Sequence, residues 1–431
     1  MNSNEISVSL DIGTSSVKVI IGEMVDDSLN IIGVGNVKSE GLKKGTIVDI
    51  DETVHSIKKA IEQAERMVGV SINQVVVSVP ANNVQLQDAH GVVAVSSESR
   101  QNREISNDDV LRVIDAAQFI SIPPEREIID MIPKQFIVDG YDEISDPRGM
   151  LGVRLEVEGT IITTSRTILH NLLRCVEKAG LDIAAICLQP LAAGSISLSD
   201  DEKNLGVALV DMGGGSTTIS VFNDGFLQST SVLPVGGDHI TKDLAIGLRT
   251  STEDAEKIKI KHGHAFYDDA SEEEVFNVPI IGSDQHEQYS QLQISDIIEA
   301  RLEEILLLVQ KEIKKMGIGD LPGGFVLTGG VVNLPGVLEL SQLVFRSNVR
   351  IAKPDYIGVR EPQFSTGVGL LQFAYEHARI QGTKISSSVS IDSAEKRPAR
   401  QPQAKNNSKT NTNGDQNIGK KVKRFFGLFF E

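Results

Sequence analysis

The sequence predicts an α/β protein organised in two halves. At 431 residues the chain is long enough for two or more domains with buried cores. Short apolar strands alternate with amphipathic helices along most of its length. One strand–turn–strand pattern occurs twice, about 200 residues apart, and each copy opens one half of the chain.

The predicted elements follow in order along the chain. Residues 6–24 form a hairpin of two alternating strands around a turn of small residues, and 51–69 form an amphipathic helix. From about 74 to 165 the sequence predicts short strands and one helix, 106–120, capped by Ser106 or Asn107. The remaining predictions are a helix at 165–180, the second hairpin at 205–222, helices at 250–263 and 294–317, and a strand entering a glycine turn at 323–330.

The charge is distributed unevenly along the chain. The net charge is −17, but residues 384–431 carry ten basic and four acidic side chains, so this tail is +6 and the rest is −23. An acidic body argues against nucleic acid as the main partner. There is no signal-peptide pattern at the N-terminus, and no segment approaches the ~18 apolar residues needed to cross a bilayer. Cys175 and Cys187 lie in apolar contexts, which predicts reduced core residues.

The two hairpins have the composition of a phosphate-binding turn. Residues 10–22 and 210–222 both read as apolar strand, Asp, apolar residue, Gly, small residues and second strand. Glycines let a backbone approach anionic oxygens, while backbone N–H groups and hydroxyls donate to them. The predicted phosphate-binding residues are Gly13, Thr14, Ser15, Ser16, Lys18, Gly213, Gly214, Gly215, Ser216 and Thr217.

Each hairpin also ends its first strand with a carboxylate. We expect Asp11 and Asp211 to face each other across a cleft and to hold Mg²⁺ through its waters, because this ion gives up its waters reluctantly. A single such turn is usually only a tight turn, whereas two copies favour a polyphosphate clamp. The third element, Gly329–Gly330 after a buried strand, is suited to close contact with a flat base and ribose.

The order of hairpin, hairpin and glycine loop resembles the actin-like ATPase superfamily, which includes heat-shock chaperones and sugar kinases. This resemblance implies an actin-like fold of two α/β domains around a cleft that binds ATP. It suggests that 188–192 and 364–369 connect the domains, and that Gln189 orients the attacking water, so that hydrolysis is slow. Glu256 and Lys259 match the ribose-contacting pair. The plainer alternatives are a capping or hinge residue at Gln189 and a solvated charged face carrying Glu256 and Lys259.

The end of the chain predicts a membrane-binding helix. Written as a helix, residues 417–431 place Val422, Phe425, Phe426, Phe429 and Phe430 on one face. The basic residues beside this face are Lys420, Lys421, Lys423 and Arg424. Such a helix is suited to lie in an anionic membrane interface. The alternative is that it docks on its own body, but residues 384–416, almost without large apolar side chains, read as a disordered linker.

A cleft, a linker and an amphipathic end together resemble the FtsA family of bacterial cell-division proteins. The resemblance implies filament formation, membrane attachment on the cytoplasmic face at the division site, and capture of the C-terminal tail of FtsZ. Arg301 is the candidate contact for that tail, although a surface arginine more often serves solubility. The implied subdomains are 1A (1–83, 165–195 and 362–383), 1C inserted at 84–164, 2A (196–228 and 310–361) and 2B (229–309).

In FtsA-like proteins the inserted subdomain is the expected contact for later division proteins, and the chain would act mainly as a scaffold, at most as a slow ATPase. The alternatives are a pilus-assembly relative of the same fold, a sugar or metabolite kinase, and a chaperone. A kinase has no use for the C-terminal helix, and a chaperone would need a β-rich C-terminal domain.

Overall fold

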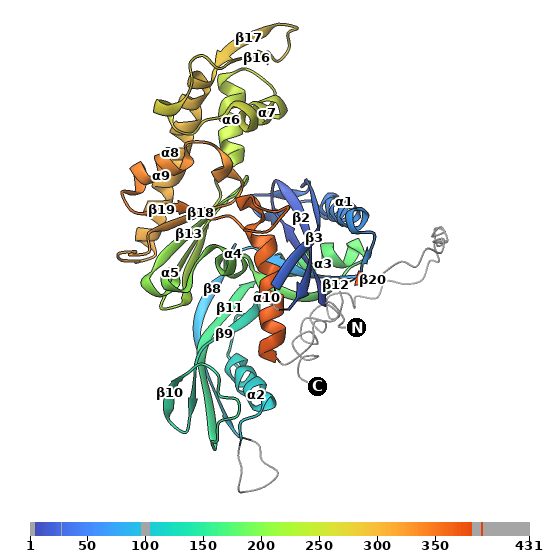
Figure 1. The fold of residues 1–431 in the computed structure, drawn as a ribbon, viewed down its shortest axis with the longest axis vertical. Helices are drawn as coiled ribbons and strands as arrows, with labels where there is room; N and C mark the ends of the chain where they lie inside the picture. Colours follow the sequence, from blue (N-terminus) through green and yellow to red (C-terminus); the bar gives the residue numbers. More distant parts are fainter. Residues whose placement is uncertain (1–4, 27, 96–103, 382–388, 391–431) are drawn as a thin grey trace, which may run out of the picture. The chain divides into compact units, whose positions relative to one another are not determined.

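The computed structural model describes residues 5–26, 28–95, 104–381 and 389–390. They divide into a large unit, the described residues of Met1–Asp88, Ser121–Lys134 and Gly159–Ser390, and a small unit, those of Ala89–Ile120 and Gln135–Glu158. Figure 1 shows the elements of both units. The α/β fold class with an inserted subdomain is confirmed.

The first half of the large unit is built on a five-stranded sheet in the order β12-β7-β1-β2-β3. The predicted first hairpin is its centre, with β1 and β2 antiparallel and Asp11 opposite Lys18. Strands β7 and β12 add in parallel on the other side of β1. The strands are β1 (Glu5–Ile12), β2 (Ser16–Val25), β3 (Ser28–Lys38), β7 (Gln74–Val79) and β12 (Asp182–Leu188).

The second half repeats this arrangement. Its sheet has the order β15-β14-β13-β18-β19, with β13–β14 as the second hairpin and β18 and β19 added in parallel. Each half therefore consists of a hairpin, a third antiparallel strand and two parallel strands, which confirms the internal repeat. The strands are β13 (Val207–Met212), β14 (Thr217–Asn223), β15 (Phe226–Leu233), β18 (Phe325–Thr328) and β19 (Val349–Ile351).

A helix follows the last strand of each sheet, and the two helices pack against each other. These are α4 (Gln189–Ser197), which starts directly after β12, and α10 (Ser365–Gln381), which confirms the predicted helix start near 364–369. Their backbones are so close at Gly369 that a Cβ there would lie 1.7 Å from the carbonyl oxygen of Ala192. Glycine is needed here because any side chain would push the helices apart.

The other helices pack beside the sheets. In the first half α1 (Ile50–Val68) and α3 (Arg166–Ala179) contact each other, and in the second half α8 (Gln291–Lys315) contacts α9 (Val337–Phe345) and α6 (Gly237–Gly247). Buried apolar residues of α8, β13 and β18 form one continuous core. Other elements of the large unit are β4 (Leu42–Lys43), β5 (Thr46–Ile47), β6 (Ser71–Ile72), α5 (Asp200–Leu205), α7 (Thr252–His262), β16 (Val275–Pro279) and β17 (His286–Ser290).

The inserted region has the predicted composition of short strands with one helix. A four-stranded sheet in the order β10-β9-β11-β8 runs with α2 (Asn107–Gln118). Ser106 caps α2 as predicted, and it forms a capping box with Asp109. The strands are β8 (Gln85–Ala94), β9 (Arg126–Val138), β10 (Tyr141–Ile144) and β11 (Arg154–Ser165).

Some boundaries differ from the prediction. Helix α8 begins at Gln291 rather than Ile294, because Ser290 and Gln293 form a capping box three residues earlier. Within the predicted linker, β20 (Val389–Ser390) pairs with the two-residue strand β6, so this short part has regular structure. Backbone pairing with a strand edge needs no large apolar side chain. The rest of the linker from 391 on and the predicted helix 417–431 lie outside the described residues.

Candidate functional site

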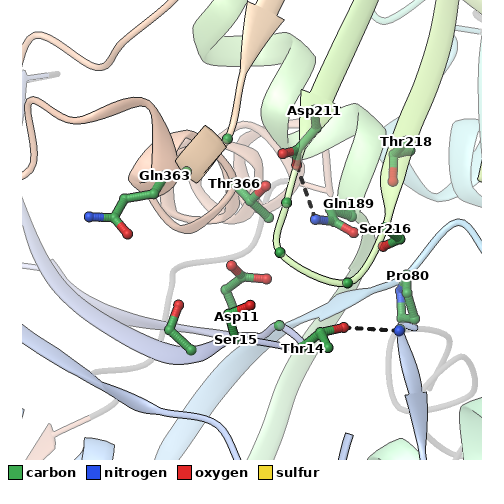
Figure 2. A pocket seen from close by; sticks show the side chains of 18 of the residues that line it. Asp11, Thr14, Ser15, Pro80, Gln189, Asp211, Ser216, Thr218, Gln363 and Thr366 are labelled. Carbon is green, nitrogen blue, oxygen red and sulfur yellow. Dashed lines mark hydrogen bonds between the residues drawn. The ribbon is translucent and has the colours of Figure 1, made fainter. Parts of the chain in front are cut away.

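A polar pocket in the large unit collects the ends of strands from both halves of the repeat. Figure 2 shows Asp11 and Asp211 pointing into the same space from opposite sides. Because strands β1 and β13 each end at the pocket, their carboxylates meet there although they are 200 positions apart. The lining residues are Asp11, Ile12, Gly13, Thr14, Ser15, Ser16, Lys18, Gly45, Pro80, Asn82, Gln189, Asp211, Gly213, Gly214, Gly215, Ser216, Thr218, Gly329, Gly330, Pro362, Gln363 and Thr366.

The first carboxylate is held by two buried neighbours. Ser78, on β7, donates its hydroxyl to Asp11 Oδ1 over 2.8 Å. Lys18, on β2, donates to Asp11 Oδ2 over 3.4 Å. All three side chains are buried, with 4%, 8% and 5% exposure for Ser78, Lys18 and Asp11. The carboxylate orientation is therefore set by the sheet, because both partners lie on strands adjacent to β1.

The second carboxylate carries a perturbed pKa. Burial, and after it the nearby Asp11, raise the pKa of Asp211 from 3.8 to about 6, although Lys18 and Gln189 act in the opposite direction. Gln189 donates its side-chain amide to Asp211 Oδ2 over 3.2 Å, as Figure 2 shows. Two carboxylates with one nearby ammonium, that of Lys18, leave an excess of negative charge, which favours a cation in the pocket.

The two glycine turns touch each other through small side chains. A Cβ on Gly214 would lie 1.8 Å from Ser15 Oγ, and one on Gly215 would lie 2.5 Å from Thr14 Cγ2. The third loop meets the second turn at Gly329, whose φ is +93° and whose Cβ would lie 2.4 Å from Asp211 Oδ1. Glycine is favoured at these positions because the side chains of the first turn, and at Gly329 the Asp211 carboxylate and the Met212 backbone, occupy the space of a side chain.

Most of the predicted phosphate-binding residues line the pocket, but Thr217 does not. It is fully buried, and its hydroxyl donates to the carbonyl oxygen of Val235 over 2.8 Å. Successive residues of a strand point to opposite faces, and the residue that reaches the pocket is Thr218. The prediction for Thr217 was wrong for this reason.

Glu256 and Lys259 form a network beside the pocket rather than in its lining. Lys259 Nζ donates to Glu256 Oε2 over 2.6 Å and to Thr241 Oγ1 over 2.8 Å, and Thr241 also bonds Glu256. Lys259 Nζ further donates to the carbonyl oxygen of Gly237 over 3.3 Å. The two residues share one face of α7 as predicted; their contact with a ribose stays a prediction.

Several lining residues were missed by sequence reasoning. Pro80 and Asn82 follow the carboxyl end of β7, and Gly45 lies at the turn between β4 and β5. Gln363 lies in the short 3-10 helix η3 (Pro362–Phe364) just before α10, and Thr366 lies in the first turn of α10. Pro80 and Asn82 could have been predicted from the rule that ligands bind at the carboxyl ends of parallel strands, because both follow the predicted strand that ends near Val79.

The pocket residues fit Mg²⁺ held through its waters. Two carboxylates, Asp11 and Asp211, face the same space with hydroxyl and amide groups around them. Among the described residues there is no cluster of three or more His, Cys, Asp or Glu side chains that would enclose a metal. A donor set of this size suits an ion that keeps most of its waters.

The structure describes the predicted partner residue, Arg301, but not the predicted membrane residues. Arg301, on α8, is engaged in ion pairs with Asp243, at 2.5 Å, and with Glu304. Its side chain is 29% exposed, so part of it remains available at the surface. The predicted membrane residues, Lys420 to Phe430, lie outside the described residues. In the described part of the chain no helix is both long and apolar enough to cross a bilayer, and both cysteines are free and buried, as predicted.

A duplicated sheet with two glycine turns and two facing aspartates defines the actin-like class of α/β proteins. Among solved structures, the chain resembles the PilM-PilN type IV pilus biogenesis complex, with a TM-score of 0.58, 16% identity and coverage of 85% of this chain and 98% of that chain. It also resembles MreB5 of Spiroplasma citri bound to ADP, with a TM-score of 0.53, 13% identity and coverage of 88% and 98%. At these identities the likeness concerns the fold.

Sequence comparison identifies the family. A family model described as "Cell division protein FtsA" matches residues 208–369, and one described as "SHS2 domain inserted in FTSA" matches residues 81–163. The chain is 60% identical over its full length to the "Cell division protein FtsA" of Bacillus subtilis, all of which is covered. This chain belongs to the FtsA family of cell division proteins. The pilus-assembly and kinase alternatives are therefore set aside.

Proposed function

We propose that the chain is an actin-like scaffold that binds Mg-ATP in the pocket, polymerises at the membrane and anchors the FtsZ ring there. The observation that carries the nucleotide part is the pair of facing carboxylates, Asp11 and Asp211, between two glycine turns. The turns offer backbone N–H groups and hydroxyls to phosphate oxygens. Mg²⁺ bound beside the carboxylates would neutralise charge on the phosphates.

The pocket residues support slow turnover. Gln189 lines the pocket, and its amide donates to Asp211, which holds it beside the carboxylate. A glutamine amide orients water by hydrogen bonds but does not take up its proton at neutral pH. We therefore infer a role in positioning water, with a rate suited to timing assembly rather than to metabolism.

The proposal of membrane attachment rests on the sequence of the last fifteen residues. Four phenylalanines on one helical face provide apolar area, and each basic residue near an anionic leaflet adds roughly 1 kcal/mol. Ordering the helix costs much of this gain, so that one copy binds reversibly. Several copies in a filament would bind firmly by avidity. The rest of the chain carries a net charge of −23 and is repelled by the same anionic surface. The linker would let the helix bind while this acidic part stays away from the membrane.

The partners proposed for the chain follow from its family. They are the FtsZ tail on the region 229–309, other copies of the chain in a filament, and later division proteins on the inserted subdomain. Arg301 remains the proposed contact for the FtsZ tail, and its two intramolecular ion pairs mean that a tail carboxylate would have to share or replace them. The proposed location is the cytoplasmic face of the cell membrane at the division site.

The membrane part is tested by flotation with vesicles of phosphatidylglycerol and phosphatidylethanolamine. Phe425→Glu with Phe426→Glu should reduce vesicle binding by tenfold or more, because charges on the apolar face meet hydrocarbon (~2 kcal/mol each). The matched control, Phe425→Leu with Phe426→Leu, keeps the apolar face and should bind nearly as the unmodified chain does. Equal binding by the glutamate variant would contradict membrane attachment through this helix.

The filament part is tested by electron microscopy on anionic lipid monolayers. With Mg-ATP the full chain should form filaments, and a peptide with the sequence of the FtsZ tail should be retained by them. Isolated particles under these conditions would contradict the scaffold proposal.

A further inference from the structure

A short hairpin reaches the pocket wall from outside the repeated core. Strands β4 (Leu42–Lys43) and β5 (Thr46–Ile47) pair around a two-residue turn, Lys44–Gly45. Both turn residues have positive φ, +51° and +74°, as in a type I′ turn. Gly45 lines the pocket, and its backbone N–H donates to Thr14 Oγ1 over 2.9 Å, the bond drawn at Thr14 in Figure 2.

The turn is held in this position by Asn82. The side-chain amide of Asn82 donates to the carbonyl oxygen of Lys44 over 3.3 Å. A Cβ on Gly45 would lie only 3.0 Å from Asn82 Oδ1, so the turn and the asparagine are in close contact. Gly45 is therefore required both for its backbone conformation and for the room it leaves.

The backbone of Asn82 and Asn83 is held by hydrogen bonds from Thr164 and Arg126. The carbonyl oxygen of Asn82 accepts a bond from Thr164 Oγ1 over 3.3 Å, and the next carbonyl, of Asn83, accepts one from Arg126 over 2.9 Å. Arg126 also donates to the hydroxyl and carbonyl oxygens of Thr163, at 2.9 and 2.8 Å. A side chain on such a fixed backbone loses little entropy when it orders the turn.

Sheet topology places this contact at one end of the pocket. In the order β12-β7-β1, strand β7 lies between the strand that leads into Gln189 and the strand that leads into the Thr14 turn. The residues that follow β7, including Asn82, therefore lie between the proposed water-positioning residue and the first phosphate turn. This is the end at which the terminal phosphate of a triphosphate would be attacked.

We propose that Asn82 and the Lys44–Gly45 turn are positioning residues that aim the Thr14 hydroxyl at the terminal phosphate, so that the pocket distinguishes a nucleoside triphosphate from a diphosphate. The inference rests on the proposed nucleotide binding. The Thr14 oxygen accepts the Gly45 N–H, which leaves its own proton for donation to a phosphate oxygen. Successive hydrogen bonds polarise one another, so the bond from Gly45 strengthens the one to phosphate.

The experiment measures dissociation constants of the full chain for the magnesium complexes of a non-hydrolysable ATP analogue and of ADP. Asn82→Ala frees the turn. We expect it to raise the dissociation constant of the triphosphate about three- to tenfold, which corresponds to the loss of one hydrogen bond, and that of the diphosphate less than twofold. Asn83→Gly is the matched control: it removes an amide from the same loop, suits the φ of +58° there, and should change neither constant. Thr14→Ser keeps the hydroxyl and should retain the preference.

Each outcome has a distinct meaning. Equal weakening of both nucleotides by Asn82→Ala, or no weakening, would overturn the inference and leave nucleotide binding intact. Failure of the unmodified chain to bind either nucleotide would overturn the proposed function and the inference with it. If Asn82→Ala does not fold, as judged by circular dichroism, Thr14→Val supplies the same readout, because it removes only the bridging hydroxyl. Retention of triphosphate preference by Thr14→Val would then refute the inference.

Discussion

Replacing Asp211 with asparagine removes a charge from the pocket and hardly changes the shape of the side chain. Burial and the nearby Asp11 raise the pKa of Asp211 to about 6 from its ordinary 3.8, so the native state carries a carboxylate at an energetic cost above this pH. A pKa shift of this size corresponds to at most ~3 kcal/mol of destabilisation of the native state at high pH. Since the side chain keeps some exposure to the pocket, we expect the charge to lower the free energy of unfolding by ~1–2 kcal/mol.

The sign of the pH dependence follows from proton uptake. Between pH 3.8 and about 6 the native protein binds a proton at Asp211 that the unfolded chain has lost, so stability falls as pH rises through this window. Asp211→Asn lacks this slope. Without nucleotide it should be more stable than the unmodified chain at pH 8 and no more stable near pH 4. With Mg-ATP the order should reverse, because the variant loses a carboxylate for the metal.

Urea denaturation followed by circular dichroism at pH 4, 6 and 8, with and without Mg-ATP, measures these differences. The control is Asp320→Asn, at an exposed loop position of the same unit, which should show neither effect. A buried charge at Asp211 does not destabilise the fold if Asp211→Asn is no more stable than the unmodified chain at pH 8 without nucleotide. If the variant is still more stable than the unmodified chain at pH 4, its gain in stability does not come from the charge of Asp211.

Two further substitutions test the packing and the first carboxylate. Gly369→Ala should destabilise the chain by ~3 kcal/mol or more in urea denaturation, because its Cβ would lie 1.7 Å from the carbonyl oxygen of Ala192. The control Gly319→Ala places its Cβ in open space and should not change stability. A small effect of Gly369→Ala would contradict the close contact between α4 and α10. Ser78→Ala leaves Asp11 Oδ1 without its buried donor and should weaken Mg-nucleotide binding, measured by titration, about five- to twentyfold. Ser78→Thr keeps the hydroxyl and should restore the affinity. Unchanged affinity in Ser78→Ala would show that Lys18 alone orients Asp11.

Much of the fold was predictable because its signals are local. A strand followed by Asp, Gly and small residues identifies a hairpin from neighbours in the sequence, and the repeat of this pattern predicted the two halves. Helix starts were predicted where a capping residue was recognised, as at Ser106, and were missed where it was not, as at Ser290. The equivalence of the two five-stranded sheets was not predictable from these signals, because strand order depends on pairings between distant segments.

The site was predictable in its centre and not at its edge. Asp11, Asp211 and the glycines carry their signal in the hairpin pattern, and the structure brings them to one pocket. Thr217 was misplaced by a single position in a strand, which reverses the face that a side chain occupies. One of the two buried partners of Asp11, Ser78, has no sequence signal at all, because a serine in an apolar strand does not reveal what it will face.

The chemistry of the pocket is readable from short stretches of sequence, because its two carboxylates and two glycine turns are each encoded in a few consecutive residues. The basic, phenylalanine-rich end, read in the same way, predicts a membrane-binding helix. Only the tertiary structure decided which distant groups orient that chemistry, among them Ser78 on Asp11 and the Gly45 turn on Thr14. The reason is that a turn is a property of adjacent residues, whereas these contacts arise where parallel strands and a separate hairpin end at the same edge of a sheet.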